Sequence, residues 1–207
     1  DTASAIAAIP IDEGGMYISS GTWSLVGVEN KVPVTSENAL SANFTNEGGV
    51  EYRYRFLKNI MGMWLFQNIR KNLDKKFTYD EMMQMAMESS YDKLIDPTDD
   101  CFLAPENMIE AIRNYLGKPE LPIGDVLNSV YHSLAFSYDK TVKEIERVGL
   151  LRNVDIRWMD HIDAMDQLKR SMGLMGYGQK DPVIVFRDQS LDMFEEMTNG
   201  IREGTVD

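Results

Sequence analysis

Apolar and polar positions near the start of the chain predict two strands beside a short helix. Residues 2–9 are small and apolar, which suits a helix packed closely on a sheet. Two β-prone runs, residues 16–20 and 23–28, flank Gly21 and Thr22. Apolar and β-branched runs on either side of a glycine are typical of a strand, a tight turn and a second strand. This part of the chain therefore predicts a β-hairpin.

The middle of the chain predicts helices. Apolar residues recur at spacings of three and four between residues 57 and 69, which predicts one helix over that range. Thr78 is followed three positions later by Glu81, the pattern of a capping box, so a second helix is expected to begin there. Further apolar stripes predict helices over about 105–117 and about 123–148. Strands combined with these helices indicate an α/β fold.

A new apolar stripe follows the helix that ends near residue 148. Its members are Leu151, Val154, Trp158, Ile162, Met165 and Leu168. A glycine-containing loop at residues 173–178 and an Asp-Pro step at 181–182 interrupt the pattern, and a last helix is expected over about 190–206. The C-terminal part therefore predicts an α-helical hairpin.

The charge balance limits the classes of partner. The chain has 207 residues, 43% of them hydrophobic, and a formal net charge of -12. Because phosphate binding needs clustered Lys and Arg, this acidic balance argues against a nucleic-acid partner. It does not exclude a nucleotide held through Mg²⁺ and backbone amides. No apolar run reaches the roughly 18 residues of a membrane-spanning helix, so no membrane span is expected.

The cysteine content and the first residues suggest where the protein works. The single cysteine, Cys101, cannot form an internal disulfide, which favours a reducing, cytoplasmic compartment. Its Asp- and Pro-rich surroundings indicate a loop, in which a half-buried spacer is expected rather than a reactive thiol. The sequence opens on Asp-Thr-Ala-Ser without a basic and then apolar leader. We therefore expect a fragment that has no signal peptide.

Four motifs in the first two thirds of the chain are informative together. They are Asp-Thr-Ala-Ser-Ala at 1–5, Ile-Ser-Ser-Gly-Thr-Trp-Ser at 18–24, Asn-Phe-Thr-Asn-Glu-Gly-Gly at 43–49 and Leu-Lys-Asn-Ile-Met-Gly-Met-Trp at 57–64. In this order the set resembles the FGGY sugar kinases of the rhamnulokinase type, from residue 1 to about 147. The resemblance implies part of an actin-like ATPase (ribonuclease H-like) domain that uses ATP and Mg²⁺ to phosphorylate L-rhamnulose.

The resemblance assigns the catalytic role to Asp1 and a sugar contact to Thr2. A kinase must take a proton from the attacking sugar hydroxyl, and a fixed carboxylate within hydrogen-bond reach can accept it. The alternative is that Asp1 is a solvated terminal residue. A neighbouring α-amino charge would then favour the ionised carboxylate and weaken it as a base.

The same resemblance places Asn59 at the sugar, and Gly21, Thr22 and Gln67 at ATP. Glycine lets the backbone approach a phosphate, and a threonine hydroxyl can donate to a phosphate oxygen. On the predicted helix, Asn59 and Gln67 would lie on nearly one face. Each residue has a structural alternative, because Gly-Thr pairs are common in turns and polar helix residues are commonly solvated. Residues 46–49 have two alternatives: they form a loop near the kinase site, or they form a turn with a purely structural role.

The resemblance also implies what is missing. The first domain of such kinases, with its own phosphate loop, and a later Gly-Gly-Gly stretch at the adenosine are not in the sequence. We therefore expect the isolated chain to be inactive.

Residues from about 144 to 207 carry a second set of motifs. They lie at 146–155, 158–168 and 176–182, and they resemble the helical scaffold and two-helix finger of the SecA preprotein translocase. We therefore expect a sugar-kinase domain over 1–147 and a SecA-like hairpin over 148–207. The second resemblance implies that Tyr177, at the hairpin tip, contacts a translocating polypeptide at a SecYEG-type channel. The alternative is an ordinary exposed loop tyrosine.

Three hypotheses remain open from the sequence. The chain is a fragment of a sugar kinase, or a polypeptide-contacting helical hairpin, or a chimera of two ancestries joined by one continuous helix near residues 143–150. A metal site at His161 is not expected, because Asp160 and Asp163 are its neighbours in sequence and no convergent ligands are evident.

Overall fold

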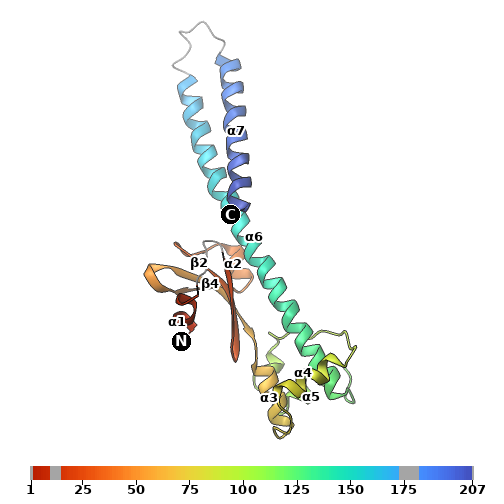
Figure 1. Cartoon of the computed structure of the whole chain (residues 1–207). Coiled ribbons are helices and arrows are strands. Elements are labelled where there is room, and N and C mark those ends of the chain that lie inside the picture. Colours follow the sequence, from red (N-terminus) through yellow and green to blue (C-terminus); the bar gives the residue numbers. More distant parts are fainter. Residues whose placement is uncertain (1, 10–14, 173–181, 207) are drawn as a thin grey trace. The chain divides into compact units, whose positions relative to one another are not determined.

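The chain folds into two compact units, Asp1–Ile145 and Glu146–Asp207. The computed structural model describes residues 2–9, 15–172 and 182–206 (Figure 1). Helices and a small antiparallel sheet occur together in the first unit, which confirms the expected mixed α/β class. The predicted catalytic Asp1 and the predicted tip residue Tyr177 lie outside the described residues.

The sheet of the first unit has four strands in the order β1-β2-β4-β3, and each neighbouring pair is antiparallel. The strands are β1 Met16–Ser20, β2 Trp23–Asn30, β3 Thr45–Gly48 and β4 Tyr54–Met61. Helix α1, Thr2–Ala7, precedes them and contacts β1. The predicted hairpin is therefore confirmed, with Gly21 and Thr22 between its two strands.

The prediction of one helix over residues 57–69 is wrong. Residues Tyr54–Met61 form β4, and only Trp64–Asn72 form a helix, α3. Strand β4 is paired on both sides, with β2 and with β3, and most of its side chains are buried. Its buried residues Phe56 and Leu57, and likewise Ile60 and Met61, are neighbours in sequence and so point to opposite faces, which removes the alternation with period two. The apolar residues of β4 and α3 together are spaced three and four positions apart, which is the spacing expected of one helix.

The remaining elements of the first unit are mostly helical. They are α2 Glu37–Ser41, α4 Tyr79–Met87, α5 Met108–Tyr115 and the part of α6 (Ile123–Met172) up to Ile145, with short 3₁₀ helices at Val50–Tyr52 and Asp100–Phe102. The capping box before α4 is confirmed: the backbone N–H of Glu81 donates to Thr78 Oγ1 at 3.2 Å, and the backbone N–H of Thr78 donates to Glu81 Oε2 at 2.7 Å. Helix α6 runs through residues 143–150 without a break, so the predicted helix end near residue 148 is wrong, whereas the continuous helix of the chimera hypothesis is present.

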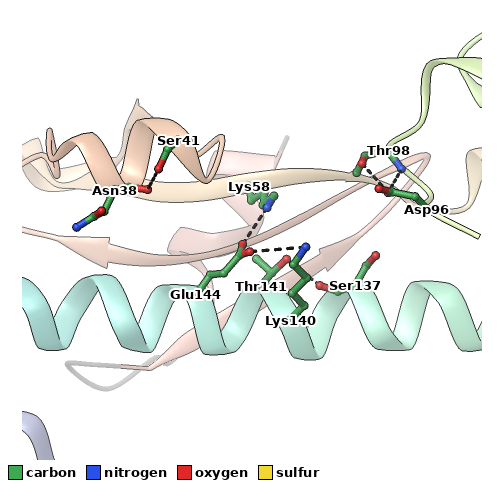
Figure 2. A network of polar contacts seen from close by, with 9 residues as sticks. All are labelled: Asn38, Ser41, Lys58, Asp96, Thr98, Ser137, Lys140, Thr141 and Glu144. Atoms are coloured by element: carbon green, nitrogen blue, oxygen red, sulfur yellow. Dashed lines mark hydrogen bonds and ion pairs between the residues drawn. The ribbon is translucent and has the colours of Figure 1, made fainter.

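Helix α6 is joined to one face of the sheet by polar side chains. Tyr138 and the fully buried Ser24 hydrogen-bond through their hydroxyls at 2.7 Å. Lys58 on β4 donates to Glu144 on α6 at 2.9 Å, as Figure 2 shows. Since Ser24 and Lys58 lie on the face that α6 covers, the residues that alternate with them lie on the opposite face.

The second unit consists of the end of α6 and helix α7, Pro182–Val206 (Figure 1). Asn153 Nδ2 donates to the carbonyl oxygen of Ile201 at 3.1 Å, and the rings of His161 and Phe194 lie 6.0 Å apart. Two neighbouring helices agree with the predicted hairpin. Helix α7 begins earlier than predicted, at Pro182, because proline is favoured in a first helical turn, where its missing N–H costs nothing.

Candidate ligand-binding cleft

An open cleft of about 640 Å³ lies on the sheet face opposite α6. Its described lining consists of Thr2, Ser19, Gly21, Thr22, Trp23, Leu25 and Asn59. Leu25 is paired with Ser19 on β1 and with Asn59 on β4. Directly opposed residues in a sheet point to the same face, so three strands each contribute a side chain to the cleft.

The turn between β1 and β2 is held against the start of α3. The backbone N–H of Gly21 donates to the carbonyl oxygen of Trp23 at 3.1 Å. The carbonyl oxygens of Gly21 and Thr22 accept from the N–H groups of Met63, at 2.9 Å, and Trp64, at 3.0 Å. These bonds satisfy N–H groups that a helix start otherwise leaves without partners. They also fix the turn that forms one end of the cleft.

Gln67 contacts the same turn from the first half of α3. Its Nε2 donates to Thr22 Oγ1 at 3.5 Å. The expectation that Asn59 and Gln67 share a helix face is wrong, because Asn59 lies on β4 and Gln67 on α3. The chain nevertheless places Asn59 in the cleft and Gln67 against the residue at its edge.

The structure therefore brings most of the predicted site residues together. Those in the cleft lining are Thr2, Gly21, Thr22 and Asn59, and Gln67 is bonded to Thr22. Ser19, Trp23 and Leu25 also line the cleft and were not predicted from the sequence. The alternation of strand side chains would have placed Trp23 and Leu25 on one face. To place Ser19 on the same face, one must know which residues of β1 and β2 are paired, and the sequence does not determine that register.

The described lining of the cleft is electrically neutral. It offers hydroxyl groups, one amide, one indole and one aliphatic side chain, and no described lining residue carries a charge. Such a surface can hydrogen-bond a neutral ligand in several directions and cover its apolar parts. Thr22 Oγ1 accepts from Gln67, so its own proton can be donated to a ligand oxygen.

Residues 46–49 take part in structure rather than in the cleft. Asn46 exchanges two hydrogen bonds with the backbone of Val34, at 2.8 and 3.0 Å, and Glu47 pairs with the buried Arg55 at 2.9 Å. Near this pair, burial of Tyr17 raises its pKa to about 12, with the Arg55 charge opposing the rise. Among the described residues, the Tyr17 hydroxyl has no hydrogen-bond partner.

Cys101 is exposed, so the prediction of a half-buried spacer is wrong. It belongs to the 3₁₀ turn Asp100–Phe102, which is capped by Asp99. Partial desolvation of the thiol and its interaction with the Asp99 carboxylate raise the pKa of Cys101 to about 11. A thiol with a raised pKa is a poor nucleophile at neutral pH.

His161 of the second unit lies near two aromatic rings. The centroid of its ring is 5.9 Å from that of Trp158 and 6.0 Å from that of Phe194. Residues 2–9, 15–172 and 182–206 contain no group of three or more His, Cys, Asp or Glu side chains that could hold a metal ion. Within the same ranges, no helix is both long and apolar enough to cross a membrane.

The fold is a mixed α/β first unit, with an open cleft whose described lining is uncharged, and a helical second unit. A family model described as the SecA Wing and Scaffold domain matches residues 43–207, and the chain belongs to this family. The chain is also similar to rhamnulokinases. That of Oceanobacillus iheyensis is 47% identical over 153 residues, which cover 72% of this chain and 32% of that protein.

Two further rhamnulokinases extend this similarity. The protein of Bacillus subtilis is 40% identical over 154 residues, 72% of this chain and 32% of its own length. The protein of Pectobacterium carotovorum is 41% identical over 172 residues, 81% of this chain and 34% of its own length. The chain thus spans about a third of the curated relatives it matches. Because these matches cover most of the chain and the SecA match begins at residue 43, the two similarities share residues.

Proposed function

We propose that the first unit is part of an ATP-dependent sugar kinase that phosphorylates L-rhamnulose. The observation that carries this proposal is the 40–47% identity to rhamnulokinases over about three quarters of the chain. In this proposal the sheet and α6 belong to an actin-like ATPase domain of a cytoplasmic enzyme. The uncharged lining among the described residues supports the sugar part of the proposal, because a polyol needs hydroxyl and amide partners.

The sugar would bind at the Thr2 and Asn59 side of the cleft, with Asp1 as its general base. Thr2 and Asn59 both line the cleft, so one ligand can reach both side chains. A carboxylate at the preceding position would then accept the proton of the sugar hydroxyl as that oxygen attacks the γ-phosphorus.

The phosphates of ATP would bind at the turn formed by Gly21 and Thr22. The turn offers close backbone approach and the Thr22 hydroxyl, while Gln67 orients that hydroxyl by donating to its oxygen. No described residue of the cleft lining is a carboxylate. Mg²⁺ would therefore be held chiefly by the phosphate oxygens, as is common for this ion, and would neutralise charge on the transferred group.

Calorimetric titration of the chain with L-rhamnulose and with Mg·ATP tests this proposal. We expect Asn59→Ala to weaken sugar binding about tenfold, and Gln67→Ala to weaken Mg·ATP binding by a similar factor, because each removes one or two ligand hydrogen bonds. Asn114→Ala, an exposed position on α5, is the control. Absence of saturable binding of both ligands would contradict the proposal.

A second candidate function concerns the helical unit. The match to the SecA Wing and Scaffold family extends through residue 207, and the unit exposes large apolar side chains such as Met159 and Leu191. We propose that this hairpin contacts a polypeptide through Tyr177, at a SecYEG-type channel. A photoreactive amino acid at position 177 should crosslink an added unfolded polypeptide. The same group at the 97% exposed Tyr52 is the control, and equal yields at both positions would contradict this candidate.

A further inference from the structure

The largest apolar side chain in the cleft has no assigned role. Trp23 is the first residue of β2 and one of the described lining residues. Its side chain is 44% exposed. A tryptophan left this open to solvent offers a large apolar surface that a ligand can cover.

The backbone holds Trp23 firmly in place. Its carbonyl oxygen accepts the N–H of Gly21 at 3.1 Å, and on the other side Trp23 is paired with the buried Met61 of β4. The next residue, Ser24, is fully buried and bonded to Tyr138. A tryptophan has only two side-chain torsions, so a ligand that covers it costs little side-chain conformational entropy.

The polar partners around the indole fit a polyhydroxylated ligand. Ser19 and Asn59 flank Leu25 across the three strands, and both line the same cleft as Trp23. A sugar has apolar C–H faces and a rim of hydroxyl groups, so an apolar platform with hydroxyl and amide groups beside it matches both parts.

We propose that Trp23 is the platform on which the apolar face of the sugar packs, and that Ser19 hydrogen-bonds a rim hydroxyl beside Asn59. This inference rests on the proposed sugar-kinase function and adds two residues to its sugar site. Trp23 would set the preference for a ligand with an apolar face, whereas Ser19 and Asn59 fix its orientation.

Fluorescence of a single tryptophan tests the contact directly. The chain has three tryptophans, Trp23, Trp64 and Trp158, so W64F/W158F leaves Trp23 as the only reporter. Saturating L-rhamnulose should shift its emission and protect it from acrylamide quenching. An emission and a quenching constant that stay unchanged while calorimetry shows saturation would overturn the inference.

Binding by variants separates this inference from the function on which it rests. We expect Trp23→Ala to weaken L-rhamnulose binding at least about tenfold, and Trp23→Phe, which keeps an aromatic face, by less than about threefold. Binding of Mg·ATP should change less than twofold in both. The thermal midpoint of each variant, expected near the wild-type value for a side chain this exposed, shows that the fold is kept.

The remaining outcomes are distinguishable. Suppose that the wild type binds L-rhamnulose, that Asn59→Ala weakens this binding and that Trp23→Ala leaves it unchanged. In that case the inference fails and the proposed function stands. If Trp23→Ala weakens the binding of Mg·ATP and not the binding of the sugar, the indole faces the nucleotide and the inference also fails. If the wild type binds no L-rhamnulose, both fail.

Discussion

The two units differ in how they bury apolar side chains. The first unit has a sheet and helices around a core in which Val26, Leu57 and Leu127 are fully buried. Among the described residues of the second unit, the buried hydrophobic side chains are Val148 and Met197. Since buried apolar area is the main source of stability, the first unit is expected to unfold at higher denaturant concentration. The cleft lies in the first unit, which has the larger buried core.

Gly27→Ala should have the largest effect on this difference. A Cβ atom at position 27 would lie 2.5 Å from the carbonyl oxygen of Phe56 and 2.9 Å from the Tyr17 hydroxyl oxygen. The first of these atoms belongs to the backbone of β4 and cannot move without disturbing the sheet. We expect the first unit to lose about 3 kcal/mol, measured by urea unfolding followed by tyrosine and tryptophan fluorescence.

Gly149→Ala is the matched control for this substitution. Position 149 lies within α6, and a Cβ atom there would meet nothing within 4 Å. Alanine is favoured over glycine in a helix by about 0.5–1 kcal/mol, so the control should stabilise the protein. If both variants destabilise equally, close packing in the sheet is not the cause.

Met197→Ala should affect the second unit alone. Met197 is 9% exposed and is one of the few buried side chains of the hairpin. Its loss should cost about 2 kcal/mol, the lower end for methionine, because so little else encloses it. Limited proteolysis should then cleave α7 sooner, while cleavage within the sheet stays unchanged. Faster cleavage of both units would mean that they do not unfold separately.

Tyr17→Phe should have a small effect at neutral pH and a larger one in alkali. The raised pKa of Tyr17 means that the folded state disfavours the tyrosinate. The full stability is therefore present below about pH 10 and is lost as the pH rises towards 12. At pH 7 the variant should lie within about 1 kcal/mol of the wild type, because the deleted hydroxyl has no hydrogen-bond partner among the described residues.

The alkaline loss should disappear in this variant. Urea unfolding of both proteins from pH 8 to 12 measures the difference. A parallel fall in stability for the two proteins would contradict the assignment to Tyr17.

The alkylation rate of Cys101 should show the smallest effect, and it also reports on unfolding of the first unit. Because its pKa is raised to about 11, alkylation by iodoacetamide should be slow at pH 7–8 and rise about tenfold per pH unit up to that value. Unfolding of the second unit should leave this rate unchanged, whereas unfolding of the first should raise it. A rate at pH 8 equal to that of a free cysteine would contradict the raised pKa.

The sequence predicted the elements whose signals are local. The hairpin around Gly21 and the capping box at Thr78 depend on residues a few positions apart, and both are present. Strand β4 was missed because it lies between two partners. Its assignment depends on pairing with β2 and β3, and β2 lies about thirty residues away in sequence.

The residues of the cleft divide in the same way between local and long-range signals. The local pattern predicted the turn at Gly21 and Thr22, and the resemblance assigned these two residues, with Asn59 and Gln67, to the site. Ser19 joins the lining only through strand register, and the contact of Gln67 with Thr22 joins positions far apart in sequence. These features arise from tertiary packing, which periodicity within one segment does not encode.

Hydrogen exchange with and without L-rhamnulose tests the central claim most directly, because one experiment covers both units. The account predicts added protection in peptides from residues 16–30 and 54–67, which contain most of the described cleft lining, and none in residues 146–172 and 182–206. Protection confined to the helical unit, or no change at saturating sugar, would contradict the account.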